Sequence, residues 1–434
     1  MISRRVMSLS CLLLTLAVYW QSSLLAENWP SWRGPTGNGI STEKGLPTEW
    51  SASKNVAWRI KLPGQGGATP AVWDNHIFVT AVDDNELVLL AFDISGKQLW
   101  REVLATGDKK VRGDEGNAAS PSPVTDGKHV WAMMANGALA CYDFKGNKTW
   151  SQDLQELFGR FRIAFGMTSS PVLHDGRLFL QLIHGDGQAS TQEALVAALD
   201  AGNGKELWRQ YRVTKARAEN EHSYASPILY QDATQTYLVT HGADFAIAYA
   251  LKDGKEIWRL GGLNPHEDPK RPYHSTLRFV ASPAAVPGMI VVPTAKNGPV
   301  FAIKADGKGD LTGNESVHHW IRPKNTPDVP SPLIHEGLVY LCRESGDLIC
   351  MEADSGEQHY LERTHRIRHR ASPVYADGHI YLAGRDGKVS VVKAGRDFKL
   401  VSQNEIGDDV SASLAVSNGT IYIRSYNYLW AIRN

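Results

Sequence analysis

The sequence predicts an all-β fold: an eight-bladed β-propeller of four-stranded antiparallel blades, with its ring closed by the N-terminal strand. Three observations predict it. An internal repeat occurs eight times, a tryptophan recurs near the end of most copies, and an isolated strand precedes a set of copies whose last member is one strand short. The 39 Gly and 21 Pro among 434 residues are typical of a chain with many turns.

Each copy of the repeat follows the same plan. A short apolar strand opens after a Ser-Pro pair in most copies, and an Asp-Gly turn such as Asp377-Gly378 leads into an alternating strand at 379–382. A second Gly turn and a third strand follow, and a fourth strand carries the tryptophan. The eight copies begin at Ala68, Ala119, Ser169, Ala225, Ala281, Pro330, Ala371 and Ala412.

The two ends of the repeat region predict how the ring closes. The eighth copy stops after its third strand, at 429–432, whereas residues 55–59 form a lone strand that contains Trp58. We expect the lone strand to complete the eighth blade, because closure removes two open sheet edges. The propeller then spans residues 55–434 and is preceded by an N-terminal arm, residues 27–54.

Residues 1–26 read as an export signal. Arg4 and Arg5 precede an apolar run at 9–20, and small residues lead to Ala26. The apolar run is too short to cross a bilayer, which needs about 20 helical residues. We expect a cleaved signal peptide and a periplasmic or secreted protein that is not an integral membrane protein once processed. The Sec route is favoured over the twin-arginine route, because Met7 stands where the twin-arginine motif prefers Phe.

The charge balance limits the kinds of partner that the protein can bind, and the cysteine content leaves two interpretations open. The 46 basic and 46 acidic residues balance, which argues against nucleic acid as a partner; we expect a monomer. Cys342 and Cys350 flank a turn, so a cross-hairpin disulfide and two buried free thiols are both open interpretations. Residues 365–370 hold three Arg and two His and indicate a solvated or anion-facing loop.

The blades resemble the PQQ-like, or quinoprotein-type, propeller repeat. In that family a blade ends in Ala-x-Asp-x-x-x-Gly-x-x-x-Trp, and the third copy matches it with Ala198, Asp200, Gly204 and Trp208. The resemblance implies that the blade-ending aromatic residues pack between neighbouring blades. Besides Trp208, these residues are Trp58, Trp100, Trp150, Trp258, Trp320 and Tyr360. The overall pattern is similar to the outer-membrane assembly factor family called BamB.

No catalytic residue can be assigned from the sequence. The quinoprotein dehydrogenases usually carry a vicinal Cys-Cys pair beside the quinone, and neither that pair nor a haem-binding CxxCH is present. We therefore expect an exported, non-enzymatic scaffold or binding module without a cofactor, which recognises an envelope protein or another ligand. The main alternative is a PQQ-dependent oxidoreductase that binds PQQ with Ca²⁺. A polysaccharide-active propeller is a third interpretation.

The connections between blades predict where binding occurs. From the blade-ending aromatic to the Pro of the next copy, four connections span 19 to 25 residues and three others only 12 or 13. These connections leave a propeller on one face, so the long ones should raise a wall there, and long loops on a rigid scaffold commonly bind ligands. The candidate binding residues in them are Arg112, Arg160, Arg162, Arg217, Glu221, His222, Tyr224, His274 and Arg278.

Overall fold

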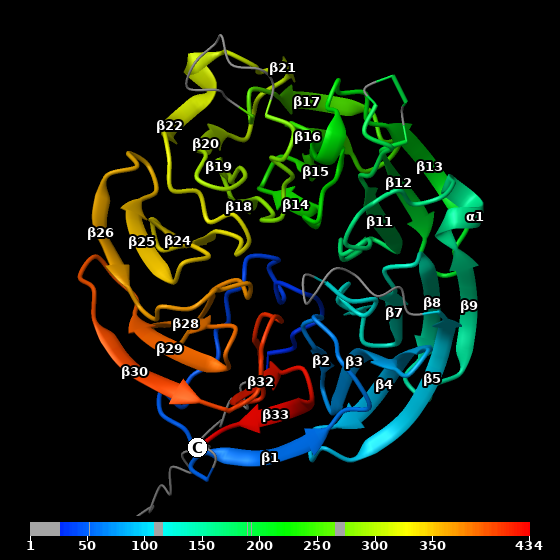
Figure 1. Ribbon diagram of the computed structural model, residues 1–434, viewed down its shortest axis with the longest axis vertical. Coiled ribbons are helices and arrows are strands. Elements are labelled where there is room, and N and C mark those ends of the chain that lie inside the picture. Colours follow the sequence, from blue (N-terminus) through cyan, green and yellow to red (C-terminus); the bar gives the residue numbers. More distant parts are fainter. Residues whose placement is uncertain (1–26, 52, 108–115, 189, 192, 265–273) are drawn as a thin grey trace, which may run out of the picture.

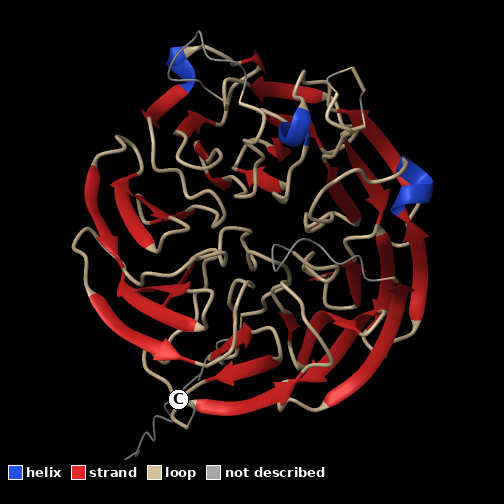
Figure 2. Ribbon diagram, in the orientation of Figure 1, coloured by secondary structure: helices blue, strands red, loops and turns tan. Residues whose placement is uncertain are grey.

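The computed structural model describes residues 27–434 except 52, 108–115, 189, 192 and 265–273. The expected signal peptide and Arg112 therefore lie outside the described residues. Eight sheets surround a central axis as the blades of a propeller (Figure 1), and the described helical segments are short (Figure 2). The predicted eight-bladed all-β fold is confirmed.

Every blade has the same strand order from the axis outward. The innermost strands are β2 (Ala71–Trp73), β6 (Val124–Thr125), β10 (Val172–His174), β14 (Ile228–Gln231), β18 (Ala284–Val286), β23 (Leu333–His335), β27 (Val374–Ala376) and β31 (Ala415–Ser417). The second strands are β3 (His76–Asp83), β7 (His129–Met133), β11 (Arg177–Leu182), β15 (Thr236–Gly242), β19 (Met289–Val292), β24 (Leu338–Cys342), β28 (His379–Ala383) and β32 (Thr420–Arg424).

The third strands are β4 (Glu86–Asp93), β8 (Ala138–Asp143), β12 (Leu195–Asp200), β16 (Phe245–Ala250), β20 (Val300–Lys304), β25 (Asp347–Glu352), β29 (Lys388–Lys393) and β33 (Tyr428–Ile432). The outermost strands are β5 (Gln98–Thr106), β9 (Lys148–Asp153), β13 (Glu206–Tyr211), β17 (Glu256–Leu260), β22 (His318–Arg322), β26 (Gln358–Arg363), β30 (Leu400–Glu405) and β1 (Val56–Lys61).

The fourth blade departs from the four-stranded plan. A short strand, β21 (Gly309–Asp310), pairs in parallel with β17 at its outer edge and gives this sheet a fifth strand. It comes from the insertion that joins β20 to β22 in the fifth blade. The helical segments are α1 (Leu154–Phe158) and the 3₁₀ turns η1 (Ala218–Glu221) and η2 (Glu315–Val317). In the described part of the chain, no helix has the length and apolar character that a membrane crossing requires.

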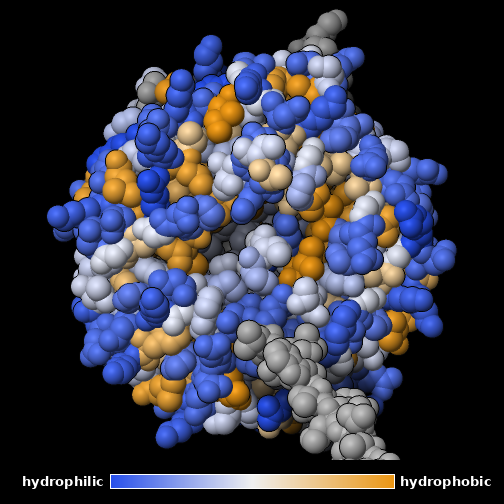
Figure 3. Space-filling model, turned by 180° about the vertical axis from the view of Figure 1, so that it is seen from behind, coloured by the Kyte–Doolittle hydropathy of each residue, from blue (hydrophilic) through white to orange (hydrophobic). Residues whose placement is uncertain are grey.

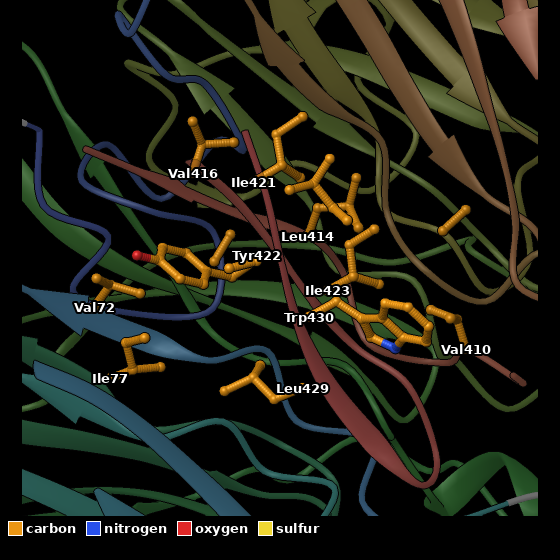
Figure 4. Close-up of a cluster of buried hydrophobic side chains, with 14 of the residues drawn as sticks. Val72, Ile77, Val410, Leu414, Val416, Ile421, Tyr422, Ile423, Leu429 and Trp430 are labelled. Atoms are coloured by element: carbon orange, nitrogen blue, oxygen red, sulfur yellow. The ribbon is translucent and has the colours of Figure 1, made fainter. Parts of the chain in front are cut away.

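The ring closes through β1, as expected. This strand pairs antiparallel with β33 from Val56 opposite Ile432 to Lys61 opposite Tyr428, so the first strand lies beside the last (Figure 1). The cluster behind this joint combines blades seven, eight and one, and Ile421, Leu429 and Trp430 are at most 1% exposed in it (Figure 4). The two ends of the chain thus share one hydrophobic core.

The inner hairpins turn as the sequence indicates. Asp175-Gly176, Asp377-Gly378 and Asn418-Gly419 all have positive φ at both positions, as a type I′ two-residue turn requires. Such a turn matches the twist of the flanking strands and fixes their register. It places the first two strands of these copies side by side.

The blade-ending tryptophans reach across to the next blade. In five blades the indole Nε1 donates a hydrogen bond to a backbone oxygen in the turn before the next outermost strand: Trp58 to Ile94, Trp100 to Phe144, Trp150 to Ala201, Trp208 to Leu251 and Trp320 to Ala353, at 2.6–3.0 Å. The repeat's glycine lies in the same turn. A Cβ on Gly204 would lie 2.6 Å from the Trp150 ring, so only glycine fits under the indole.

Other members of the motif fix the turn itself. Asp200 Oδ1 accepts from the backbone N–H of Gly202 at 2.8 Å and of Asn203 at 3.1 Å, and Ala198 lies opposite Trp208 across β12 and β13. A small residue there leaves room for the indole. Two copies differ: Trp258 is fully buried with no partner for its Nε1 among the described residues, and Tyr360 packs edge-on against Phe398.

The seventh blade has a serine, Ser402, where its neighbours have the aromatic residue, because Ser402 pairs with Val391 as Tyr360 pairs with Cys350. The arm contributes an indole to this blade. Trp50 is 4% exposed, stacks on Tyr381 with ring centroids 6.4 Å apart, and belongs to the cluster that joins blades seven and eight. We infer that Trp50 substitutes for the missing blade-ending aromatic.

The arm crosses the face that carries the inner hairpin turns, here called the arm face. Trp29 exchanges backbone hydrogen bonds with Val72 of blade one, and Tyr375 of blade seven donates to Gly39 O and accepts from Ser41 N. Gly34 has φ +72°, and a Cβ there would lie 2.7 Å from the Trp29 ring. The glycine-rich sequence of the arm thus permits its tight path.

The cysteine alternatives are resolved in favour of free thiols. Cys141, Cys342 and Cys350 are all unpaired and buried. Cys350 faces Tyr340, not Cys342, across the β24–β25 hairpin, so the register keeps the two sulfur atoms apart. These cysteines fill apolar space between strands.

Candidate functional site

The Ser-Pro pairs of the repeat surround the axis. The backbone N–H of the residue before Pro donates to the hydroxyl of the equivalent residue in the next blade, at 2.8–3.0 Å, and Thr69 Oγ1 donates to Ser413 O at 3.1 Å to complete the circle. The members are Thr69, Ser122, Ser170, Ser226, Ser282, Ser331, Ser372 and Ser413. We call this circle the axial hydroxyl ring. It gives the axis a polar wall.

A funnel opens from this ring to the face opposite the arm, here called the loop face. On this face the connections between blades contact the turns that join the second and third strands of a blade. For example, Ala135 N in the β7–β8 turn donates to Ala118 O in the connection that precedes β6. The funnel has a volume of about 230 Å³ and is lined by polar residues from many connections and by the hydroxyl ring. Trp32 of the arm borders its inner end.

Two of the predicted loop residues meet at the funnel mouth. The Arg278 guanidinium lies 5.6 Å from the centroid of the Phe165 ring, and Phe165 packs 5.8 Å from Tyr224. Arg278 Nε is also 3.3 Å from Glu219 Oε1, which orients the cation. Burial raises the pKa of Tyr224, so its phenol stays neutral. Phe165 was missed in the sequence, because a lone Phe in a loop carries no signal of its own.

Two further arginines line the funnel from a connection that the sequence shows to be short. Arg368 and Arg370 border the funnel together with Glu344 and Asp328. Arg368 Nε donates to Glu344 Oε1 at 3.0 Å, and Asp328 Oδ1 accepts from Lys296 N at 2.6 Å. The basic loop at 365–370 therefore faces the axis. Three arginines and two carboxylates give the described lining a net positive charge, suited to an anionic group.

A second group of predicted residues lies in the wall between blades three and four. Arg162 pairs with Asp186 at 3.2 Å and Glu193 at 3.3 Å, and Glu221 Oε2 accepts from Gly187 N at 2.5 Å. His184 and Glu221 are 2% and 6% exposed, and both border a cavity of about 50 Å³. Burial lowers the pKa of His184 to about 4 and raises that of Glu221 to about 7. This cluster ties one loop to the next.

Glu221→Gln should stabilise the protein at high pH and have little effect at low pH. The pKa of Glu221 is raised from 4.5 to about 7, so the folded protein holds this proton more tightly than the unfolded chain does, and stability is lost as pH rises between these values. The amide keeps an acceptor for Gly187 N. We expect the variant's Tm to exceed that of the wild type by about 3 °C or more at pH 8 and to match it at pH 4.5. Equal Tm values at pH 8 would contradict this assignment.

The remaining predicted residues do not converge. Arg160, Arg217 and His274 are exposed, and His222 Nε2 lies 3.2 Å from Gly185 O in the wall. The structure therefore divides the candidates between the funnel (Tyr224, Arg278) and the wall (Arg162, Glu221, His222).

The described residues of the funnel are better suited to bind the carboxylates of PQQ than to bind the Ca²⁺ that accompanies PQQ in the quinoprotein dehydrogenases. The arginines could face the carboxylates of the quinone, as an anionic cofactor needs. Calcium prefers several carboxylate and amide oxygens, whereas Glu344 and Asp328 are held by Arg368 and Lys296 N. No three His, Cys, Asp or Glu side chains are grouped to hold a metal within the described ranges. The chemistry that these residues offer is binding of an anion.

The fold and the repeat define the class: this is a PQQ-like β-propeller protein. The sequence model of the family described as "Outer membrane protein assembly factor BamB" matches residues 17–181, 87–261 and 243–434, and the chain belongs to this family. BamB from Moraxella catarrhalis superposes with a TM-score of 0.61 at 13% identity, over 87% of this chain and 97% of that one.

Dehydrogenases are also similar. A polyvinylalcohol dehydrogenase of a Pseudomonas species is 23% identical over 54% of this chain and 40% of its own length. Quinohemoprotein alcohol dehydrogenase ADH IIB of Pseudomonas putida is 26% identical over 48% of this chain and 27% of its own length. The chain thus spans less than half of these relatives. A quinohemoprotein alcohol dehydrogenase structure from Comamonas testosteroni has a TM-score of 0.65 at 13% identity, over 93% of this chain and 80% of that one.

Proposed function

We propose that the protein is an exported, non-enzymatic binding module that recognises an envelope protein through the funnel and wall of its loop face. The carrying observation is the convergence of Arg278, Arg368 and Arg370 on one axial funnel from different blade connections. Membership of a family described by outer membrane protein assembly supports an envelope partner. The leader expected at 1–26 supports export.

The proposal is tested by capture from an envelope extract with three matched variants. Arg368→Ala/Arg370→Ala removes funnel charge, and Arg160→Ala/Arg162→Ala removes wall charge. Arg396→Ala removes an exposed arginine from the β29–β30 turn, which contacts the β27–β28 turn on the arm face. We expect both double variants to capture at least about tenfold less of the partner and the control to capture as much as the wild type. Arg370 is half-buried and Arg162 is paired with Asp186 and Glu193, so the Tm of each variant is measured beside its capture. Equal capture by all variants would refute the proposal.

The second candidate is a PQQ-dependent oxidoreductase, favoured by the similarity to three dehydrogenases and by the arginines of the funnel. It is separated from the first by incubating the purified protein with PQQ and Ca²⁺ and assaying alcohols with an artificial electron acceptor. We expect no stoichiometric retention of quinone and no turnover above the buffer control. Retention with turnover would replace the binding proposal by the oxidoreductase.

A further inference from the structure

A separate cavity lies on the arm face. It has a volume of about 550 Å³, within the range of small-molecule sites. Arm residues 30–38 form one side, and the inner strands of blades two to five form the other, with Val172, Leu173, Ile228 and Leu229 among the apolar residues. Figure 3 views the molecule from behind Figure 1, and a hollow lies near the centre of that face.

The arm's own contacts explain why the cavity forms there. Along its path the arm hydrogen-bonds to the inner strands of other blades: Trp29 with Val72 of β2, Pro30 O with Thr125 N of β6, and Gly39 O with Tyr375 N of β27. No hydrogen bond between the described arm residues and β10 or β14 is present. The arm backbone therefore does not pair with these two strands, and their residues Val172, Leu173, Ile228 and Leu229 border the cavity.

Arg33 borders this cavity as a buried cation without a counter-charge. It is 5% exposed, and its Nη2 donates to Asn38 O at 2.6 Å and to Pro332 O at 2.7 Å. Its Nη1 has no hydrogen-bond partner, and no carboxylate of the described chain lies within 4 Å. Burial lowers the pKa of Arg33 to about 9, so it remains protonated at neutral pH.

Another buried arginine, Arg212, has a hydrogen-bond partner for each of its three guanidinium nitrogens. Arg212 is 3% exposed, and its three nitrogens donate to Thr240 Oγ1, Gly242 O and Phe245 O at 3.0–3.1 Å. A buried charge that lacks such partners is costly, and an anion that reaches it gains the charge-assisted hydrogen bonds that the protein leaves unmade. Arg33 is thus placed to bind an anionic group beside an apolar wall.

We propose that the arm-face cavity binds a small organic carboxylate with an aliphatic body. The carboxylate pairs with the Arg33 guanidinium, and the aliphatic body covers the apolar side chains of β10 and β14. This site has a lining different from that of the funnel, because Arg33 and the apolar residues of β10 and β14 border only the arm-face cavity, although Trp32, Ser170 and Ser226 border both. The proposal does not depend on the function of the loop face.

Octanoate and its uncharged analogue octanamide test the proposal by titration calorimetry on the purified protein. They share the aliphatic body and differ in charge, so the ratio of their affinities reports the guanidinium. We expect wild-type protein to bind octanoate at least about tenfold more tightly than octanamide, and Arg33→Met to abolish that preference.

A surface position keeps the test valid if Arg33→Met fails to fold, since Arg33 also holds the arm to Pro332. Thr36 is exposed, borders the cavity and makes no hydrogen bond among the described residues. Thr36→Glu should weaken octanoate binding by about threefold, Thr36→Lys should strengthen it by a similar factor, and Thr36→Gln should match the wild type, because only charge changes among them.

The result that overturns the proposal is equally specific. Octanoate and octanamide of equal affinity, or no octanoate binding up to about 10 mM, would show that no anion site exists. Octanoate binding that is indifferent to the charge at position 36 and to a folded Arg33→Met variant would place the ligand elsewhere.

Discussion

Replacing Val56–Lys61 by six alternating Gly and Ser residues should lower Tm by about 10 °C or more and promote aggregation. The replacement keeps the chain length but removes β1, the strand that joins the two ends of the ring. Blade eight would then present β33 as an open edge. The loss includes Trp58, whose Nε1 donates to Ile94 O at 2.9 Å in the first blade, and Arg59, which lies 5.2 Å from the Trp430 ring centroid.

The control is the same replacement of Gln358–Arg363, the outermost strand of blade six. It also deletes one outer strand and its aromatic residue, yet the chain still runs continuously from this blade to the next. We expect the β1 replacement to have the lower Tm and stronger light scattering, because only β1 closes the ring. A β26 replacement that is equally damaging would show that strand loss, not closure, governs stability.

The architecture was predictable because its signals recur. A single Asp-Gly turn or Ser-Pro pair indicates only local geometry. Eight copies of the repeat predict a ring of blades, and the missing strand of the last copy predicts how the ring closes. Two features had no repeated signal. Strand β21 pairs with β17 because an insertion in the neighbouring blade folds back. Trp50, which we infer to substitute for an aromatic residue at Ser402, comes from a segment outside the repeat. A contact between two segments that each occur once, far apart in the chain, produces no repeated sequence pattern by which it could be predicted.

The sequence indicates only part of the candidate site, because its indicator is the length of the blade-to-blade connections. Connection length singled out Tyr224 and Arg278, which border the funnel, but it gave equal weight to Arg160, which is exposed and does not border it. Arg368 and Arg370 lie on a short connection and face the axis nonetheless. The Ser-Pro pairs predict only where strands start, whereas in the structure the serine hydroxyls encircle the axis. Whether a residue borders the funnel depends on its position within the connection, and the length of the connection does not specify that position.

Trp208→Ala should lower the free energy of unfolding by about 3–5 kcal/mol, which is the range for removing a large buried aromatic side chain. We propose that Trp208 docks blade three onto blade four. The side chain is 8% exposed, its Nε1 donates to Leu251 O at 3.0 Å, and a Cβ on Gly254 would lie 2.5 Å from its ring. Leu207→Ala is the matched control, because Leu207 is 47% exposed on the same strand and should cost less than about 0.5 kcal/mol.

A double-mutant cycle with Gly254→Ala separates docking from simple loss of volume. Gly254→Ala alone forces a methyl group into the Trp208 ring at a position with φ +71°, so it should destabilise the protein by about 1–3 kcal/mol. In the Trp208→Ala background the ring is gone, and only the backbone strain remains. We therefore expect a coupling energy of about 1 kcal/mol or more from urea unfolding of the four proteins. Additive costs would show that the indole and this glycine do not depend on each other, and the docking role of Trp208 would have to be abandoned.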